Sequence, residues 1–336
     1  MLVVVGYLLL AAVATAIVWI GADALEGAGN RLALYYGVPA IVQGAIIAAV
    51  GSSMPELVTA VLAPVVHGDF ELGLAVIVGS AIFNILVIPA LSTLAEPGPL
   101  GASRQLVYKE AQFYLIAVAS FLLVLSLAVI YYPVEGPTLQ GELSPLLAIG
   151  LLALYGLYIF IQYEDTIEHQ ATRPMDTIDP WRTWATFIGA FLLILVGVEG
   201  LLRSAIGIGD ALGTPSFVWG LTIIAAATSL PDAFVSIRAA QADRSVTSIA
   251  NIFGSNVFDL LVAVPAGVLA AGVAPVDFER LTPLLTVLVL ATILLFATLR
   301  TDYELSRVEA GTLLASYVGF LTWMVLAAIG VIVGPV

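Results

Sequence analysis

The sequence predicts an all-α membrane protein with ten transmembrane helices, arranged as two inverted five-helix repeats. Composition, regularly spaced apolar segments and an internal repeat lead to this prediction. Of the 336 residues, 61% are hydrophobic and only 10% are charged, whereas a soluble domain carries about 25% charged residues. Apolar runs of roughly 20 residues, the length that crosses a bilayer, recur from one end of the chain to the other.

Glycines, prolines and charged residues separate the apolar stretches into ten predicted spans. In order, the spans centre near residues 11, 52, 82, 120, 154, 194, 227, 257, 290 and 321. A polar stretch over residues 164–183 divides them into two sets of five. We therefore expect a first repeat over residues 1–163, a cytoplasmic linker over 164–183 and a second repeat over 184–336.

The loops between the predicted spans carry an uneven distribution of basic residues. Nine bases fall on one side of the membrane: Arg31, Arg104, Lys109, Arg173, Arg182, Arg238, Arg244, Arg300 and Arg307. The other two, Arg203 and Arg280, fall on the opposite side. Because loops rich in Lys and Arg remain in the cytoplasm, this distribution predicts that both termini are extracellular.

The two halves of the chain share an internal repeat. A shift of 176 residues aligns positions 21–56 with 197–232, and 10 of these 36 positions are identical. A shift of 175 aligns residues 79–84 with 254–259. Because each repeat holds an odd number of spans, the second copy enters the membrane from the opposite side, as in many secondary transporters.

Three acidic residues lie near the centres of predicted spans, where each charge costs about 2.5–3.5 kcal/mol. They are Glu56, Asp232 and Asp259. Polar side chains accompany them in both repeats: Ser52, Ser53, Ser80 and Asn84 in the first, and Thr228, Ser229 and Ser255 in the second. All of these groups offer oxygen ligands, which hard cations such as Ca²⁺ prefer.

Prolines precede two of the three acids and add a second source of oxygen. Pro55 and Pro231 cannot donate a hydrogen bond to the carbonyls of Gly51 and Ala227, four residues earlier. Irregular backbone at membrane depth is tolerated where it lines a cavity. Two such helices meeting across an axis in the membrane plane predict a cation site near the middle of the bilayer.

Composition also excludes several classes of function. The chain has no cysteine and only two histidines, His67 and His169, which argues against redox chemistry and soft-metal sites. Both histidines are predicted in loops. A formal net charge of −13 argues against nucleic acid as a partner. Glu199 and Arg203 are expected to form an ion pair within one helix.

The motifs around these acids resemble the two alpha-repeats of the cation/calcium exchanger superfamily, in particular its sodium/calcium exchanger family. The first copy reads GSSMPE at 51–56 and GSAIFN at 79–84, and the second reads ATSLPD at 227–232 and GSNVFD at 254–259. The resemblance places the alpha-1 motif at about 40–90 and the alpha-2 motif at about 215–265. It implies export of Ca²⁺ across the cell membrane, driven by Na⁺ entry through alternating access.

The resemblance also implies a role for each matching residue. Glu56 and Asp232 correspond to the acids that coordinate Ca²⁺ and share it with Na⁺. The Na⁺ sites would be completed by the hydroxyls of Ser52, Ser53, Ser80, Thr228, Ser229 and Ser255 with the carbonyls of Ala49 and Ala225. Asn84 and Asp259 would flank the centre. Asn256 is set aside because its repeat counterpart is Ala81.

Further implications concern partners and chemistry. An exchanger of this kind needs no cofactor and is not an enzyme; its partners are Ca²⁺, Na⁺ and the lipid bilayer, and we expect a monomer. The sequence departs from the common microbial pattern with Asp232 in place of glutamate, Ser52 in place of threonine and Ala227 in place of glycine. The shorter acid at 232 retracts one ligand by about one methylene.

Several alternatives remain open at this stage. The same acids could release protons in an H⁺/Ca²⁺ antiporter, and the aspartates at 232 and 259 are similar to the K⁺-dependent branch of the exchangers. A passive cation channel is a third hypothesis. A fourth is an intramembrane aspartyl protease, because residues 207–210 match its GxGD pattern, although Asp210 is predicted in a loop before Pro215.

Overall fold

The computed structural model of the chain describes residues 2–37, 49–136, 138–164, 178–331 and 334. The first half contains α1 (Leu2–Tyr35), α2 (Ala49–Ser52), α3 (Met54–His67), α4 (Phe70–Leu86), α5 (Ile88–Ala95), α6 (Arg104–Leu106), the π-helical turn η2 (Val107–Ala111), α7 (Gln112–Tyr131) and α8 (Pro145–Glu164). Three short strands, β1 (Leu100–Gly101), β2 (Pro133–Val134) and β3 (Gln140–Leu143), connect them.

The second half contains α9 (Pro180–Leu212), α10 (Ser216–Trp219), the π-helical turn η3 (Gly220–Ile224), α11 (Ala225–Thr228), α12 (Leu230–Gln241), α13 (Ser245–Phe258), the π-helical turn η4 (Asp259–Ala263), α14 (Val264–Ala271), α15 (Phe278–Arg300) and α16 (Arg307–Ala328). Its strands are β4 (Ala274–Asp277) and β5 (Glu304–Leu305). Strand β1 pairs antiparallel with β5, and β3 pairs antiparallel with both β2 and β4. These small sheets tie the loops of the two halves together, a feature that the all-α prediction did not include.

The helices agree with the ten predicted spans. Within the described residues, nine helical segments are long and apolar enough to cross a membrane, and they contain nine of the ten predicted centres. The remaining predicted centre, residue 52, is the last residue of α2 and is followed by α3; residues 38–48, which precede α2, lie outside the described part. Residues 165–177 of the predicted linker also lie outside the described part, and α9 begins at Pro180, within the stretch assigned to that linker.

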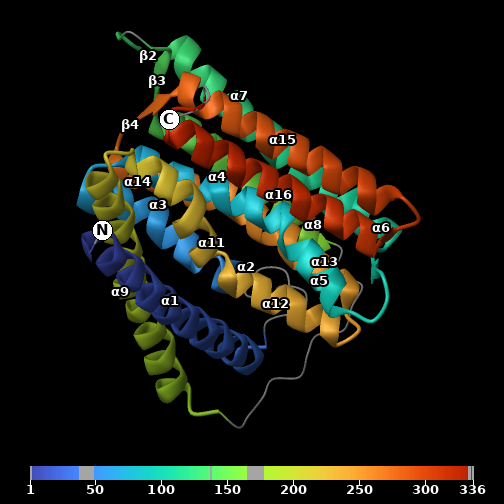
Figure 1. Cartoon of the computed structure of the whole chain (residues 1–336). Helices are drawn as coiled ribbons and strands as arrows, with labels where there is room; N and C mark the ends of the chain where they lie inside the picture. Colours follow the sequence, from blue (N-terminus) through green and yellow to red (C-terminus); the bar gives the residue numbers. More distant parts are fainter. Residues whose placement is uncertain (1, 38–48, 137, 165–177, 332–333, 335–336) are drawn as a thin grey trace.

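The two repeats meet in a symmetric contact between their first helices. In Figure 1, α1 and α9 lie side by side at the lower left, next to the main bundle. A Cβ placed on Gly21 would lie 2.8 Å from Ile194, and a Cβ on Gly197 would lie 2.7 Å from Val18. These are repeat counterparts, because 18 and 21 become 194 and 197 after the shift of 176. Such reciprocal contacts are the mark of a twofold relation, so the inverted repeat predicted from the sequence is present in the fold.

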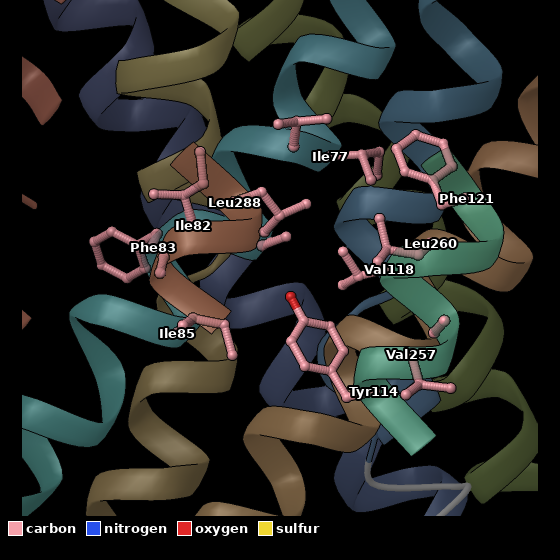
Figure 2. Packing of buried hydrophobic residues seen from close by; sticks show 14 of the residues in the cluster. Ile77, Ile82, Phe83, Ile85, Tyr114, Val118, Phe121, Val257, Leu260 and Leu288 are labelled. Carbon is pink, nitrogen blue, oxygen red and sulfur yellow. The ribbon is translucent and has the colours of Figure 1, made fainter. Parts of the chain in front are cut away.

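The centre of the bundle is formed by α4 and α13, which follow the two kinked segments in the chain. All residues of α4 from Leu72 to Leu86 are buried. Apolar side chains of α4, α7, α13, η4 and α15 pack around this centre (Figure 2), with Ile77, Phe121 and Leu260 among them. The hydroxyl of Tyr114 points into the same packed region. The predicted site residues on α4 and α13 are therefore held in the most buried part of the protein.

Candidate cation site

The helices that carry Glu56 and Asp232 are both interrupted just before the acid. Helix α2 ends at Ser52 and α3 begins at Met54, while α11 ends at Thr228 and α12 begins at Leu230. In each case proline occupies the first turn of the new helix, where its missing N–H costs little. The acid therefore follows in the first turn, near the positive end of the helix dipole. The kinks predicted from Pro55 and Pro231 are present.

A close approach of α4 to the other repeat brings the two halves of the site together. A Cβ on Gly79 would lie 2.2 Å from the carbonyl oxygen of Leu221 and 2.7 Å from the Cβ of Ala225. Only glycine fits at this position without moving one of the backbones. The contact places Ser80, the next residue, against the kink of the second repeat.

Glu56 lies in a cluster of hydroxyl groups contributed by both repeats. The Ser80 hydroxyl donates to Glu56 Oε1 at 3.2 Å, and the Ser229 hydroxyl is 3.4 Å from the same oxygen. The two hydroxyls are 2.7 Å apart. Ser229 and Thr228 also donate to the carbonyl of Ala225, at 2.8 and 3.2 Å. All four polar side chains are fully buried, so this cluster has no contact with bulk solvent.

Asp232 lies in a second buried cluster. The Ser255 hydroxyl donates to Asp232 Oδ1 at 2.9 Å, and the Asn84 amide donates to Asp232 Oδ2 at 3.2 Å. The Ser52 hydroxyl is a further hydrogen-bond partner of Asp232. Asn84 also donates to Asn256 Oδ1 at 3.0 Å, and Asn256 in turn donates to the carbonyl of Ala81 at 3.3 Å. The cluster joins α12 with α4 and α13.

The residues of the two clusters are repeat counterparts, but the residue type differs at one important position. Glu56 with Ser80 is the counterpart of Asp232 with Ser255. The counterpart of the Asn84 donor is Asp259, and an ionised carboxylate only accepts hydrogen bonds. Neither oxygen of Asp259, nor Glu56 Oε2, accepts a hydrogen bond of normal geometry among the described residues, although the hydroxyls of Ser53 and Ser80 lie near Asp259. Because Asp259 occupies the position equivalent to Asn84, Glu56 lacks the kind of donor that Asn84 supplies to Asp232.

Several buried oxygens therefore lack a donor within the described protein. They are Ser53 Oγ, Glu56 Oε2, Asn84 Oδ1, Asp259 Oδ1 and Asp259 Oδ2. Asp259 is also close enough to Glu56 and Asp232 to interact with both charges. A buried acceptor without a partner costs about 1–3 kcal/mol, and more when it is charged. Hard cations and protons are the chemical species that would satisfy such a set.

The acids alone do not form a metal site. In the described part of the chain, no three acidic or histidine side chains lie close enough together to hold a metal ion by themselves. A cation bound here would need hydroxyl or backbone oxygens as additional ligands, and Ca²⁺ requires six to eight oxygens in total. The buried hydroxyls around Glu56 and Asp232 are the nearest such groups.

The predicted backbone ligands have unequal surroundings. Ala225 begins α11, and its carbonyl already accepts three hydrogen bonds, from the Thr228 and Ser229 hydroxyls and from the Ser229 N–H. Ala49 is the first residue of α2, directly after the residues outside the described part. The Ala225 carbonyl would have to exchange hydroxyl donors for a cation in order to act as a ligand.

Asn256 is a site residue that the sequence analysis did not select. Its side chain is fully buried and joins Asn84 to the carbonyl of Ala81, its own repeat counterpart. Comparison of the repeats gave no signal because alanine has no polar side chain to match. The signal available in the sequence is the polar side chain itself, which lies one position after Ser255 in a largely apolar predicted span.

Two placements predicted from the sequence are wrong. His67 is the last residue of α3, because the helix continues until the αL glycine at 68 ends it, and its Nε2 lies 3.0 Å from Glu199 Oε2. Asp210 belongs to α9, which continues to Leu212 before Gly213 ends it. The predicted Glu199–Arg203 ion pair is confirmed at 2.6 Å. His169 lies outside the described residues.

Known proteins with similar sequences are membrane exchangers, antiporters or uncharacterised membrane proteins. The model of the family "Sodium/calcium exchanger protein" matches residues 6–164 and 182–326. A putative antiporter, CaxA of Alkalimonas amylolytica, is 26% identical over 90% of this chain and 93% of its own length. An uncharacterised membrane protein of Methanocaldococcus jannaschii is 28% identical, with 87% and 88% covered. Human sodium/potassium/calcium exchanger 5 is 35% identical over 44% of this chain and 30% of its own.

Solved structures show the same fold. One structure of the sodium-calcium exchanger NCX_Mj superposes with a TM-score of 0.64 at 23% identity, covering 96% of this chain and 98% of the other. The H⁺/Ca²⁺ exchanger CAX superposes with a TM-score of 0.73 at 17% identity, covering 96% and 82%. With kinked, acid-bearing helices in two inverted halves and a family model that spans both, this chain belongs to the sodium/calcium exchanger protein family of multi-pass membrane transporters.

Proposed function

We propose that the protein is a Na⁺/Ca²⁺ antiporter that exports Ca²⁺ across the cell membrane by alternating access. It works as a monomer, with both termini outside the cell, and uses no cofactor or covalent chemistry. The two repeats, with boundaries near 163 and 184, form the two halves of the transport unit. Ca²⁺ and Na⁺ occupy the same buried oxygen cluster in turn.

The observation that carries this proposal is the set of buried oxygens without donors around Glu56 and Asp259. Anionic oxygens in a dry interior are strongly destabilising unless a cation or proton accompanies them. In this proposal, Glu56 and Asp232 are the Ca²⁺ ligands and Asn84 flanks the centre, while the hydroxyls of Ser52 and Ser53 belong to the Na⁺ sites. Asp259 supplies charge at the centre.

The hydroxyl groups support Na⁺ as the coupling ion. Ser80 and Ser229 touch each other and Glu56, and Ser255 touches Asp232, so each acid already has hydroxyl oxygens beside it. Na⁺ binds through several neutral oxygens, whereas a proton needs only one acceptor. Thr228 with the carbonyls of Ala49 and Ala225 would provide the remaining Na⁺ ligands.

Two related couplings are the alternatives. CAX, which superposes well on this fold, is described as an H⁺/Ca²⁺ exchanger, and protons could neutralise the same carboxylates. The human and mouse relatives include sodium/potassium/calcium exchangers. Asp259, whose two oxygens have no donor among the described residues, is the group through which K⁺ or H⁺ coupling would act.

Flux into proteoliposomes tests the proposal. Vesicles with the purified full-length protein are preloaded with Na⁺, K⁺, or choline, and uptake of radioactive Ca²⁺ is followed with no pH gradient. A separate set of choline-loaded vesicles receives an imposed pH gradient, and Na⁺-loaded vesicles are compared with and without K⁺ in the external medium that contains Ca²⁺. We expect uptake with internal Na⁺ and none with choline.

The other outcomes identify the alternatives. Uptake driven by the pH gradient alone would overturn Na⁺ coupling and assign the protein to proton exchange. Uptake from Na⁺-loaded vesicles that requires K⁺ on the Ca²⁺ side would assign it to the K⁺-dependent branch. Uptake that depends on no counter-ion gradient would contradict antiport and indicate a passive channel.

A further inference from the structure

Two ion pairs join the α1–α9 pair to the helices that carry the site. On α1, Asp23 Oδ1 is 3.5 Å from Arg238 Nη1 of α12. On α9, Glu199 Oε2 is 3.0 Å from His67 Nε2 of α3, a contact that is an ion pair when the imidazole is protonated and a hydrogen bond when it is neutral. Asp23 and Glu199 are repeat counterparts, 176 residues apart, and so are the helix pairs that the two contacts connect. The same contact therefore occurs once in each half of the inverted fold.

The two ion pairs lie toward opposite faces of the membrane. We call the face with the start of α1 and strands β2–β4 the N-terminal face, and the opposite face, where α9 starts, the linker face (Figure 1). Asp23 lies in the second half of α1, toward the linker face. Glu199 lies in the second half of α9, toward the N-terminal face, because α9 crosses in the opposite direction. Each face thus has one acid of the α1–α9 pair bound to a site-bearing helix.

The two basic residues do not occupy equivalent positions in the two repeats. Leu62 occupies the position equivalent to Arg238, and Asp243 occupies the position equivalent to His67. The acids are retained in both copies, while each copy supplies its base from a different place on the partner helix. Each face therefore has its own acid–base pair, and duplication of the sequence alone does not account for the presence of both.

The linker-face pair lines a cavity beside the helix that carries Asp232. A cavity of about 300 Å³ is lined by Trp19, Asp23, Glu26, Pro231 and Arg238, among others. Pro231 precedes Asp232, which is fully buried. One turn deeper than the ion pair, the rings of Trp19 and Phe234 stack with centroids 4.5 Å apart and planes inclined by 13°. The ion pair and the stacked rings thus join α1 to α12 along the wall of this cavity.

We propose that these two ion pairs are gate latches: Asp23–Arg238 holds the linker face closed and His67–Glu199 holds the N-terminal face closed. Both latches are formed in this structure, and every site acid is fully buried. When the protein opens toward one face, the ion pair on that face breaks and the ion pair on the opposite face remains formed. Because α1 and α9 pack as one unit through Gly21 and Gly197, movement away from α12 presses α9 toward α3.

Cysteine labelling tests the latches on the full-length protein, which contains no natural cysteine. Val235→Cys lines the linker-face cavity, and Val58→Cys is buried against the α9 side of the other half. In the purified protein, Asp23→Asn should speed maleimide labelling at 235 by about two- to fivefold and leave labelling at 58 unchanged. Glu199→Gln should speed labelling at 58 by about tenfold and leave 235 unchanged, because its pair is less exposed.

Matched variants separate a latch from a general loss of structure. Glu26→Gln replaces a second acid of the same cavity that forms no ion pair within the described residues and interacts with Arg238 only at longer range, and it should change the rate at 235 less than Asp23→Asn does. Arg203→Gln removes the partner of Glu199 within α9 but spares the contact between helices, and should change neither rate. The exchanged pair Asp23→Arg with Arg238→Asp should restore slow labelling at 235.

The outcomes decide the proposal. Faster labelling on the matching face with rescue by the exchanged pair supports it. Equal acceleration at both reporters, or acceleration by Glu26→Gln as large as by Asp23→Asn, would overturn it, as would rates that do not change at all. The inference goes beyond the proposed exchange of Na⁺ for Ca²⁺, and because labelling needs neither ion, its failure is distinguishable from a failure of that function.

Discussion

At the scale of single residues, one asymmetry dominates the site. Asn84 and Asp259 occupy equivalent positions in the two repeats, but the amide donates a hydrogen bond to Asp232, while the carboxylate has nothing to donate to Glu56. Both oxygens of Asp232 are thus paired within the protein, whereas Glu56 Oε2 and both oxygens of Asp259 are left to a cation or proton. A single amide-to-acid difference can therefore make two repeat-related halves bind different species.

Removing one acid tests this reading. Glu56→Gln keeps the size of the side chain and its hydrogen bond from Ser80 but removes the charge. We expect Ca²⁺ binding to weaken by at least about 2 kcal/mol, or about 30-fold, because a desolvated charge interaction is lost. Asp232→Asn should behave similarly. Isothermal titration measures the binding, and an unchanged melting temperature without Ca²⁺ confirms the fold. Wild-type Ca²⁺ affinity in both variants would contradict the assignment of the two acids.

Asn256 provides a second test at this scale. Asn256→Ala removes a bridge between Asn84 and the Ala81 carbonyl and leaves both buried groups with one partner fewer. We expect a loss of about 1–3 kcal/mol in stability, seen as a lower melting temperature in detergent. Ser248→Ala is the matched control on the same helix, since the Ser248 hydroxyl is buried without a described partner. An Asn256 variant as stable as the Ser248 variant would show that the bridge contributes nothing.

At the scale of elements, the sequence predicted the interrupted helices but not their contacts. A proline inside an apolar run removes a known hydrogen bond, so the breaks at Ser53 and Ser229 follow from local chemistry. The pairing of Ser80 with Ser229, in contrast, joins residues 149 positions apart. That contact depends on how α4 packs against η3, which no local pattern specifies. The contact of His67 with Glu199 was not predicted for the same reason, because the two residues are 132 positions apart.

The packing of α4 against η3 can be tested at Gly79. Gly79→Ala would place a methyl carbon 2.2 Å from the Leu221 carbonyl oxygen and force the two elements apart. We expect a loss of about 1–3 kcal/mol or more in stability, together with weaker Ca²⁺ binding, because Ser80 moves with α4. Gly150→Ala on α8, where a Cβ meets nothing within 4 Å, should be neutral or stabilising by about 0.5–1 kcal/mol. Equal effects of the two substitutions on melting temperature would refute the argument.

At the scale of the whole molecule, the inverted repeat was predictable because duplication leaves identical residues at a constant spacing. The reciprocal contacts of Gly21 with Ile194 and of Gly197 with Val18 are the structural form of that spacing. What the repeat could not predict is the role of residues at which the two copies differ, such as Asn256 and the bases Arg238 and His67. Those differences give the two faces and the two halves of the site unequal properties.

The proposed orientation of the whole molecule is open to a direct test. In a chain without natural cysteines, Leu2→Cys and Trp181→Cys place single thiols at strongly exposed positions near opposite faces. We expect a membrane-impermeant maleimide to label position 2 in intact cells and position 181 only after lysis, because the basic loops stay in the cytoplasm. The reverse pattern would place both termini inside the cell.

The most direct test of the central claim is whether Na⁺ and Ca²⁺ compete for one buried oxygen cluster. Ca²⁺ binding to the purified protein is measured by calorimetry at increasing Na⁺, with choline keeping ionic strength constant. The account predicts that Na⁺ raises the apparent Kd for Ca²⁺ more steeply than in direct proportion, and that Glu56→Gln abolishes the Ca²⁺ heat. An apparent Kd that is insensitive to Na⁺ would contradict the account.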